Sequence, residues 1–228
     1  MKIKRKFDEA CVRFGLIEDG DRILVGLSGG KDSLALVTLL GARARIFKPS
    51  IRVEAAYVVM DNIPYESDVE YLEGFCRDCG VALHVIHTRF DESGDGRKTR
   101  CFLCARYRRR ALFDFAVERG FNKVALGHHQ DDFLITLLMN MTYEGSLTTM
   151  RPSMPMRHYP LCVIRPLCMV SEQWLREMAE ERGFLRQKRP CPYEERTRRR
   201  DMGEYLMMLE RLNPEARHSM WHAVVKGF

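Results

Sequence analysis

The sequence has 228 residues, of which 46% are hydrophobic and 30% charged, the composition of an ordinary globular protein. This length suits one domain with a core of its own. No apolar run approaches the length needed to cross a membrane, which excludes a membrane-spanning protein, and the formal net charge of +6 is a modest basic excess.

The first residues, MKIKRKFDEACVRFG, are basic but include Asp8 and Glu9 and contain no apolar segment. They predict an amphipathic helix rather than a secretory signal peptide. We therefore expect a cytoplasmic protein. In a reducing compartment, the eight cysteines of the chain indicate metal or redox chemistry more than disulfides.

Apolar runs alternate with helical patterns along the rest of the chain. Strands are predicted at 22–27, 52–61, 81–90, 122–127 and 161–167. Helices are predicted at 32–45, 68–80, 101–120, 131–143 and 171–183, followed by two more at 194–212 and 214–226. This alternation predicts an α/β fold whose five-stranded parallel sheet carries helices on both faces, with a short helical C-terminal extension.

We divide the chain into an N-terminal helix (1–21), a central α/β domain (22–185) and a basic helical extension (186–228), all within one globular unit. In parallel sheets of this kind, ligands bind beyond the carboxyl ends of the strands. The segments that follow the predicted strands are Ser28–Ser33, Asp61–Asn62, His87–Asp95, Gly127–Asp132 and Arg165–Pro166. They are therefore the first candidates for a site.

The turn Ser28–Ser33, with the sequence SGGKDS, has the features of a phosphate cradle. Gly29 and Gly30 allow the backbone to turn sharply and approach a ligand closely. The following helix points free N–H groups and its positive dipole end at the turn. With the Ser28 and Ser33 hydroxyls and the Lys31 charge, these groups favour a bound phosphate over an ordinary strand-to-helix turn.

The turn differs from a kinase-type P-loop, because Lys31 is followed by Asp32 and no glycine stands five residues before Gly30. An acid inside a phosphate cradle has a clear role when it positions Mg²⁺ beside pyrophosphate. SGGKDS resembles the PP-loop of the ATP pyrophosphatases. The resemblance implies that the turn holds the triphosphate of ATP, and that the enzyme adenylates a carbonyl oxygen before a nucleophile displaces AMP.

A second polar turn, GHHQDD at 127–132, also follows a strand and opens a helix. The spacing of His128 and His129 does not fit a HExxH zinc site. Asp131 and Asp132 stand at a helix N-terminus, where they either cap the helix or, beside a phosphate cradle, handle magnesium or substrate. The blocks ALGHHQDDFLITLLMNMTYEG and VIRPL resemble those of tRNA 2-thiocytidine synthetases and, more loosely, lysidine synthetases, which both act on tRNA cytidine.

Two cysteine pairs have C-x-x-C spacing: Cys76 with Cys79, and Cys101 with Cys104. Together they nearly fit a four-cysteine zinc pattern, although Cys76 and Cys79 also fit the core face of their helix. Cys101 and Cys104 share one face at the start of a helix, where thiolate is favoured. By itself, Cys191 between two prolines is either functional or an idle loop thiol.

The thiocytidine synthetases carry C-x-x-C after the third strand and a further cysteine after the helix of the fifth strand. Cys101, Cys104 and Cys191 match these positions, and the resemblance implies that they hold a [4Fe–4S] cluster with one open iron. Lysidine synthetases lack this trio. The sequence departs from the family in the run CPYEE, where a second late cysteine is absent. The resemblance covers about residues 20 to 212.

Arginines gather in two clusters, which either form solvated helix faces or neutralise nucleic-acid phosphates. The first holds Arg106, Arg108, Arg109 and Arg110, and the second holds Arg186, Lys188, Arg189, Arg196, Arg198, Arg199 and Arg200. With the resemblance, we expect Arg106, Arg108, Arg109, Arg110, Arg198 and Arg199 to bind the anticodon stem-loop of tRNA.

The resemblance implies a tRNA sulfurtransferase that uses ATP and Mg²⁺, adenylates O2 of a cytidine and transfers sulfur to C2. We assign catalysis to Lys31, Asp32 and Asp132, and ATP binding to Ser28, Gly29, Gly30, Lys31, Asp32, Ser33, Asp61, Gly127, His128 and Asp131. A sulfur donor such as a cysteine desulfurase is an expected partner. The apolar C-terminal stretches YLMMLERL and MWHAVV form either core or a homodimer face.

Two alternatives stand beside this interpretation. The first is a PP-loop enzyme that thiolates a different tRNA base or a small molecule. The second is a zinc-stabilised nucleotide-binding module without catalysis, in which Cys76, Cys79, Cys101 and Cys104 bind the metal and Cys191 is dispensable.

Overall fold

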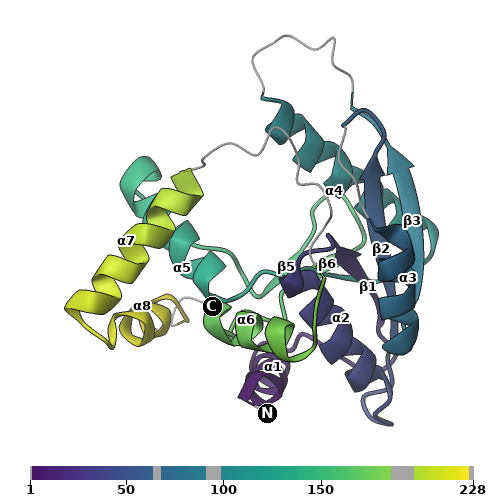
Figure 1. Ribbon diagram of the computed structural model, residues 1–228, viewed down its shortest axis with the longest axis horizontal. Coiled ribbons are helices and arrows are strands. Elements are labelled where there is room, and N and C mark those ends of the chain that lie inside the picture. The colour runs from purple at the N-terminus through teal and green to yellow at the C-terminus, as the bar shows by residue number, and fades with distance from the viewer. Residues whose placement is uncertain (1, 64–67, 91–98, 186–197, 226–228) are drawn as a thin grey trace.

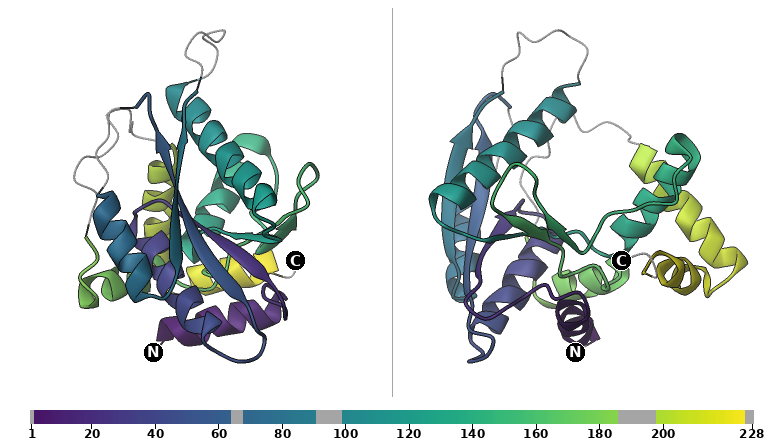
Figure 2. Two further views of the ribbon diagram at one scale, coloured as in Figure 1. Left: turned by 90° about the vertical axis from the view of Figure 1, so that its right-hand side faces the viewer. Right: turned by 180° about the vertical axis from the view of Figure 1, so that it is seen from behind.

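A six-stranded sheet lies at the centre of the protein, and helices pack against both of its faces (Figures 1 and 2). The computed structural model describes residues 2–63, 68–90, 99–185 and 198–225. The strands are β1 (Arg22–Leu27), β2 (Arg52–Met60), β3 (Ala82–Thr88), β4 (Lys123–Ala125), β5 (Ser153–Pro155) and β6 (Cys162–Ile164). Their order across the sheet is β3-β2-β1-β4-β6-β5.

The five predicted strands are all present and run parallel, but the sheet has a sixth strand that the sequence analysis missed. This strand, β5, pairs antiparallel with β6 at the edge of the sheet. It is three residues long and ends in Pro155, within a proline-rich stretch that has no strand pattern. Proline is tolerated there because an edge strand has one unpaired side.

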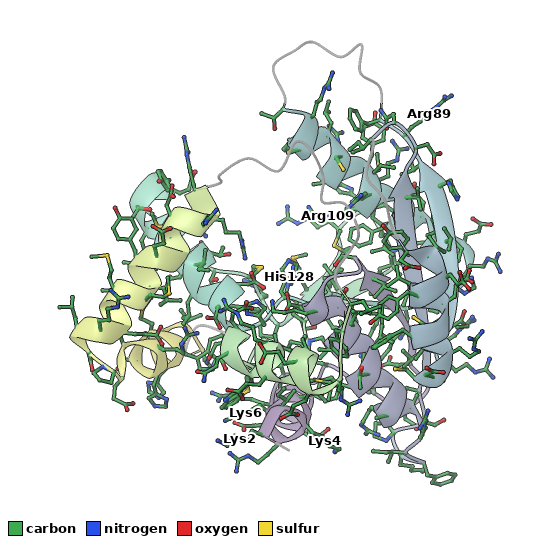
Figure 3. The ribbon with its side chains drawn as sticks, in the orientation of Figure 1. Lys2, Lys4, Lys6, Arg89, Arg109 and His128 are labelled. Atoms are coloured by element: carbon green, nitrogen blue, oxygen red, sulfur yellow. The ribbon has the colours of Figure 1, made fainter. Side chains whose placement is uncertain are left out.

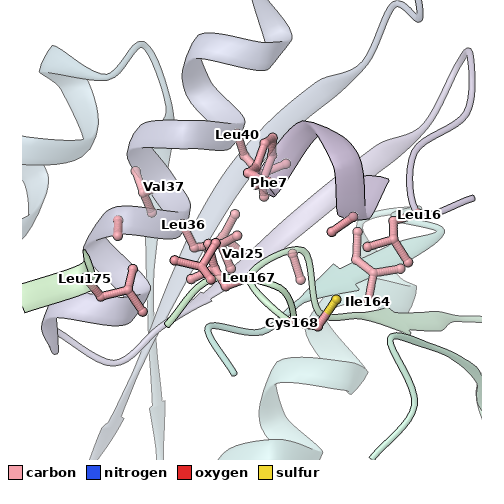
Figure 4. Packing of buried hydrophobic residues seen from close by; sticks show 14 of the residues in the cluster. Phe7, Leu16, Val25, Leu36, Val37, Leu40, Ile164, Leu167, Cys168 and Leu175 are labelled. Carbon is pink, nitrogen blue, oxygen red and sulfur yellow. The ribbon is translucent and has the colours of Figure 1, made fainter. Parts of the chain in front are cut away.

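Helices α1 (Lys2–Arg13), α2 (Lys31–Ala44), α3 (Val69–Asp78) and α6 (Glu172–Glu181) share a large hydrophobic cluster with one face of the sheet. Helix α4 (Arg100–Glu118) packs against the other face. Strand β1 shows the alternation that makes this possible, because Val25 belongs to the first cluster and Leu24 to the second. Figure 4 shows Val25 near Leu36 of α2, and Leu40 of the same helix beside Phe7 of α1.

Helix α5 (Gln130–Met139) continues into the π-helical turn η1 (Asn140–Glu144). The last two helices, α7 (Arg198–Leu212) and α8 (Ala216–Val225), lie beside α5 (Figure 1). The ring of Trp221 meets the ring of Phe133 edge to face, with centroids 5.6 Å apart. The predicted C-terminal helices are therefore present, and they pack on the same hydrophobic cluster as the central domain.

The strand order places a topological switch between β1 and β4. The chain passes from β1 to β2 and β3 on one side, and from β4 to β6 on the other. Ligands of open α/β sheets bind at such a switch, beyond the carboxyl ends of the strands. The turns Ser28–Ser33 and Gly127–Asp132 lie there. Among the described helices, none combines the length and the apolar character that crossing a membrane requires.

Candidate active site

The turn after β1 is held in shape by its own serines. Ser33 Oγ donates to the carbonyl of Gly30 (2.8 Å) and accepts from the Ser28 backbone N–H (3.1 Å). Gly29 has φ +78°, a left-handed conformation that favours glycine. Gly30 begins α2 without a capping side chain among the described residues, so the first N–H groups of the helix face the turn and suit an anion.

The turn after β4 packs directly against this first turn. A Cβ at Gly127 would lie 3.1 Å from the backbone nitrogen of Ser33 and 3.2 Å from the carbonyl carbon of Asp32. Only glycine allows this approach without moving one of the two backbones. The Asp132 carboxylate accepts from the His129 backbone N–H (3.0 Å), which closes the first turn of α5.

The two turns are joined by a network of charges that includes a residue from a third segment, Glu172 of α6. Lys31 Nζ lies 3.0 Å from Asp32 Oδ1 and 3.0 Å from Glu172 Oε2. The same Glu172 oxygen lies 3.0 Å from His129 Nε2. One carboxylate oxygen therefore contacts the lysine of the first turn and a histidine of the second.

His129 is held in its charged form by this network. Burial alone would lower its pKa, but the carboxylate of Asp131 (3.6 Å from Nδ1), the contact with Glu172 and the charges of Asp132 and Asp32 raise the pKa to about 10. Burial would likewise raise the pKa of Glu172, yet hydrogen bonds from His129 and Lys31 lower it to about 2. At neutral pH the centre holds an imidazolium and an ammonium beside carboxylates.

Asp131 and Asp132 each pair with an arginine of the C-terminal helices. Asp131 Oδ1 lies 2.8 Å from Arg217 Nη1 of α8, and its other oxygen accepts from the Glu172 backbone N–H (2.9 Å). Asp132 pairs with Arg199 of α7. Burial opposes the ionisation of both acids. The pKa of Asp131 nevertheless falls to about 2 because of the nearby His129 and Arg217. The pKa of Asp132 is also lowered, by His129 and Arg199.

A cavity of about 440 Å³ opens beside the first turn, between the sheet and α4. Cys101, Cys104 and Arg109 of α4 line one side, and Ser28 and His128 line the other. Figure 3 shows Arg109 and His128 on the two sides of this region. Among the described residues, the lining includes three arginines and no acid, which favours an anionic group in the cavity.

His128 differs from its neighbour in charge. Burial lowers its pKa to about 4, and the nearby Arg165, Arg199 and Arg109 reinforce this shift, so that His128 is neutral at pH 7. Arg165 itself is buried at the carboxyl end of β6, and its Nη1 donates to the carbonyl of Arg151 (2.6 Å). Of these adjacent histidines, His129 is therefore charged because carboxylates surround it, whereas His128 is neutral because it is buried near arginines.

The two C-x-x-C pairs lie on helices that cover opposite faces of the sheet. Cys101 and Cys104 open α4 after the capping residue Thr99, whereas Cys76 is buried in the cluster shared by α2 and α3. Burial raises the pKa of the Cys76 thiol to about 12, as expected of a core cysteine. The four-cysteine zinc site is therefore wrong. Cys191 lies outside the described residues.

The remaining predicted site residues are spread more widely. Asp61 follows β2, is exposed, and contacts His87 Nδ1 (2.8 Å) rather than the Lys31 network. Arg106 and Arg110 are exposed on α4, and Arg110 Nε lies 3.5 Å from Asp114. The guanidinium of Arg198 lies over the ring of Tyr143, 4.8 Å from its centroid. Arg108 lines the cavity with Arg109, so the first arginine cluster is divided between the cavity and the outer surface.

Both expected inorganic groups have side chains that suit them among the described residues. Donor atoms of Asp32, His129 and Glu172 lie within 4.8 Å of one another. The carboxylate oxygens of Asp32 and Glu172 are ligands that Mg²⁺ prefers, whereas a protonated His129 is not a ligand. In this structure the ammonium of Lys31 contacts both of these carboxylates. The thiols of Cys101 and Cys104 share the cavity, and thiolates bind iron–sulfur clusters.

Sequence reasoning missed Glu172, Arg217 and the charge on His129. Glu172 follows the predicted N-cap Ser171, whose hydroxyl accepts from the Trp174 N–H (3.4 Å), and an acid in a first turn is ordinary helix chemistry. The available signal was its position after the strand block VIRPL, which brings α6 to the same edge of the sheet as the two turns.

Comparisons with known proteins agree with this geometry. A family model described as a PP-loop domain matches residues 1–199. The chain is 36% identical to a tRNA-cytidine(32) 2-sulfurtransferase of Geotalea daltonii over 98% of this chain and 90% of that one, and 37% identical to the one of Geobacter sulfurreducens over 98% and 88%. The solved structure of the U34-tRNA thiolase NcsA from Methanococcus maripaludis, with its [4Fe-4S] cluster, superposes with a TM-score of 0.78 at 24% identity, covering 97% of this chain and 76% of that one.

Proposed function

The chain belongs to the tRNA-cytidine 2-sulfurtransferase family of PP-loop proteins, and from that premise we propose that it thiolates a tRNA cytidine at C2 at the expense of ATP. The observation that supports this most directly is the shared cavity. Ser28 of the phosphate cradle and the thiols of Cys101 and Cys104 line the same space. Activation by ATP and delivery of sulfur can therefore act on one base.

ATP binds with its triphosphate over the turn Ser28–Ser33. The N–H groups at the start of α2 and the ammonium of Lys31 contact the phosphate oxygens, and Asp32 holds Mg²⁺ beside them. Cytidine O2 attacks the α-phosphorus, the bond to the bridging oxygen breaks, and pyrophosphate leaves with that electron pair. Because negative charge grows on the leaving group, Lys31 and the imidazolium of His129 stabilise the transition state.

The second half of the reaction replaces oxygen by sulfur. A sulfide nucleophile attacks C2 of the adenylated cytidine, and AMP departs with the former O2. Cys101, Cys104 and Cys191 would hold the [4Fe–4S] cluster, which when bound supplies sulfide from an open iron. The start of α4 favours the thiolate form of Cys101 and Cys104 through its dipole.

The tRNA approaches along the arginines. Arg108 and Arg109 on α4 and Arg198 and Arg199 on α7 contact phosphates of the anticodon stem-loop, which carry the binding energy but no sequence information. Arg108 and Arg109 line the cavity itself, so the target cytidine must leave the stack to enter it. A cysteine desulfurase or a comparable sulfur donor restores the sulfide after each turnover.

The proposal is tested by measuring all three products in one reaction. Protein prepared without oxygen is incubated with tRNA, MgATP and a sulfide source, and AMP, pyrophosphate and modified nucleosides are quantified. We expect AMP, pyrophosphate and 2-thiocytidine in equal amounts. Equal amounts of AMP and a thiolated uridine would instead favour action on another base. AMP release without any thiolated nucleoside would contradict the proposal.

A further inference from the structure

We propose that Glu172 is a positioning residue of this reaction, whose carboxylate holds Lys31 and His129 together at the edge of the triphosphate site. The inference rests on the proposed function and deepens it. Neither the PP-loop nor the second polar turn contains this residue. It comes from α6, and its contact with Lys31 joins residues 141 positions apart in the chain.

The contacts of Glu172 leave its carboxylate little freedom. Oε2 lies 3.0 Å from Lys31 Nζ and 3.0 Å from His129 Nε2, and Oε1 lies 3.0 Å from Arg176 Nε. The backbone N–H of Glu172 donates to Asp131 Oδ2 (2.9 Å), which fixes the start of α6 against the start of α5. Both ends of the residue are therefore anchored, and its side chain is about three-quarters buried, with 24% exposed.

This arrangement sets the positions of the Lys31 and His129 side chains before ATP arrives. Lys31 has a long and flexible side chain, which would otherwise sample several orientations. Bound between Asp32 and Glu172, its ammonium is confined to one place, and the ring of His129 is confined on the other side of the Glu172 carboxylate. Preorganised charges stabilise a transition state more than charges that must first be ordered.

The same carboxylate also repels the triphosphate. Glu172 adds a negative charge beside the cradle, and this charge opposes the binding of ATP in its ground state. A positioning role therefore predicts that loss of the charge reduces turnover without weakening ATP binding. A purely structural role predicts lower thermal stability, with kcat and the Kd for MgATP preserved. A role as an indispensable metal ligand predicts weaker binding of MgATP.

The test compares Glu172→Gln with Glu177→Gln, an exposed position on the same helix whose carboxylate accepts a hydrogen bond from Gln173. The readouts are the Kd for MgATP from calorimetry and the kcat for tRNA-dependent AMP formation. For Glu172→Gln we expect kcat to fall by about 10-fold or more while the Kd stays within about 3-fold of the wild type or tightens. Glu177→Gln should change neither. An unchanged kcat, or a Kd weakened in proportion to kcat, would overturn the inference.

A second readout needs neither nucleotide nor tRNA. An ammonium held between two carboxylates exchanges its protons slowly, so Lys31 Nζ should give a resolved ¹⁵N–¹H signal in the ligand-free protein, identified by its absence in Lys31→Arg. We expect the signal to be lost in Glu172→Gln and kept in Glu177→Gln. Its persistence in Glu172→Gln would refute the positioning role even if thiolation is observed. Its loss in a protein that does not thiolate tRNA would refute only the proposed function.

Discussion

Asp132, in the first turn of α5, forms an ion pair with Arg199, in the first turn of α7. The predicted catalytic acid is thus in direct contact with an arginine that we assign to tRNA binding. Arg217 of α8 contacts Asp131 in the same way. Both acids of the second polar turn are therefore linked to the C-terminal helices, which makes those helices part of the candidate site.

Replacing Arg199 should weaken tRNA binding with little effect on folding. An ion pair with a partly exposed arginine contributes at most about 1 kcal/mol to stability. A lost phosphate contact, in contrast, reduces the slope of log affinity against log salt concentration by about one. We expect Arg199→Gln to show both effects in tRNA titrations at several salt concentrations. Arg211→Gln, at the exposed far end of α7, is the control. An equal loss of affinity in the control would contradict the assignment.

The arginines of α4 should not be equivalent. Arg109 lines the cavity, while Arg110 faces outward beside Asp114. We expect Arg109→Ala to weaken tRNA binding by about 1–3 kcal/mol and Arg110→Ala to change it by less than about 0.5 kcal/mol. Filter binding at one fixed salt concentration is sufficient for the comparison. Equal losses at the two positions would show that the whole helix face, and not the cavity rim, contacts RNA.

A methyl group at Gly127 should damage the nucleotide site. The added Cβ would lie 3.1 Å from the backbone of Ser33, so Gly127→Ala must separate the two turns. We expect a loss of about 1–3 kcal/mol in the free energy of unfolding and weaker ATP binding. Gly74→Ala in α3 is the matched control, because its Cβ has 3.7 Å to the nearest atom and alanine favours a helix. Unchanged ATP affinity in Gly127→Ala would show that the turns are not closely packed.

The charge on His129 should make stability depend on pH. Its pKa in the folded protein is about 10, above the ordinary value of 6.5, so its contribution is complete below pH 6.5 and is lost as the pH rises through 10. We expect the wild type to lose on the order of 1 kcal/mol per pH unit across that window relative to His129→Gln. Urea unfolding at pH 7 and pH 9.5 measures the difference. Parallel pH profiles for the two proteins would mean that His129 is neutral.

Much of the fold could be predicted because the apolar runs are continuous and the turns between them are distinctive. The five parallel strands and the two site turns follow from such local patterns. Strand β5 could not be predicted, since three residues ending in proline carry no periodicity and are ordered only by pairing with β6.

The site was predictable only where its residues are neighbours in the sequence. The contacts of Lys31 with Glu172 and of Asp131 with Arg217 join distant segments and leave no trace in local spacing. The zinc alternative failed for a related reason. C-x-x-C spacing shows that two thiols share a helix face, but not which face of the sheet that helix covers, and Cys76 and Cys104 lie on opposite faces.

The central claim is that the ATP cradle and the cavity cysteines act on one tRNA cytidine. It is tested most directly by nucleoside mass spectrometry of tRNA incubated with the wild type, Lys31→Ala, Cys104→Ser and Lys4→Ala, the last altering an exposed lysine of α1 far from the cavity (Figure 3). We predict 2-thiocytidine with the wild type and Lys4→Ala and none with Lys31→Ala or Cys104→Ser. Formation of 2-thiocytidine by Lys31→Ala or by Cys104→Ser would contradict the account.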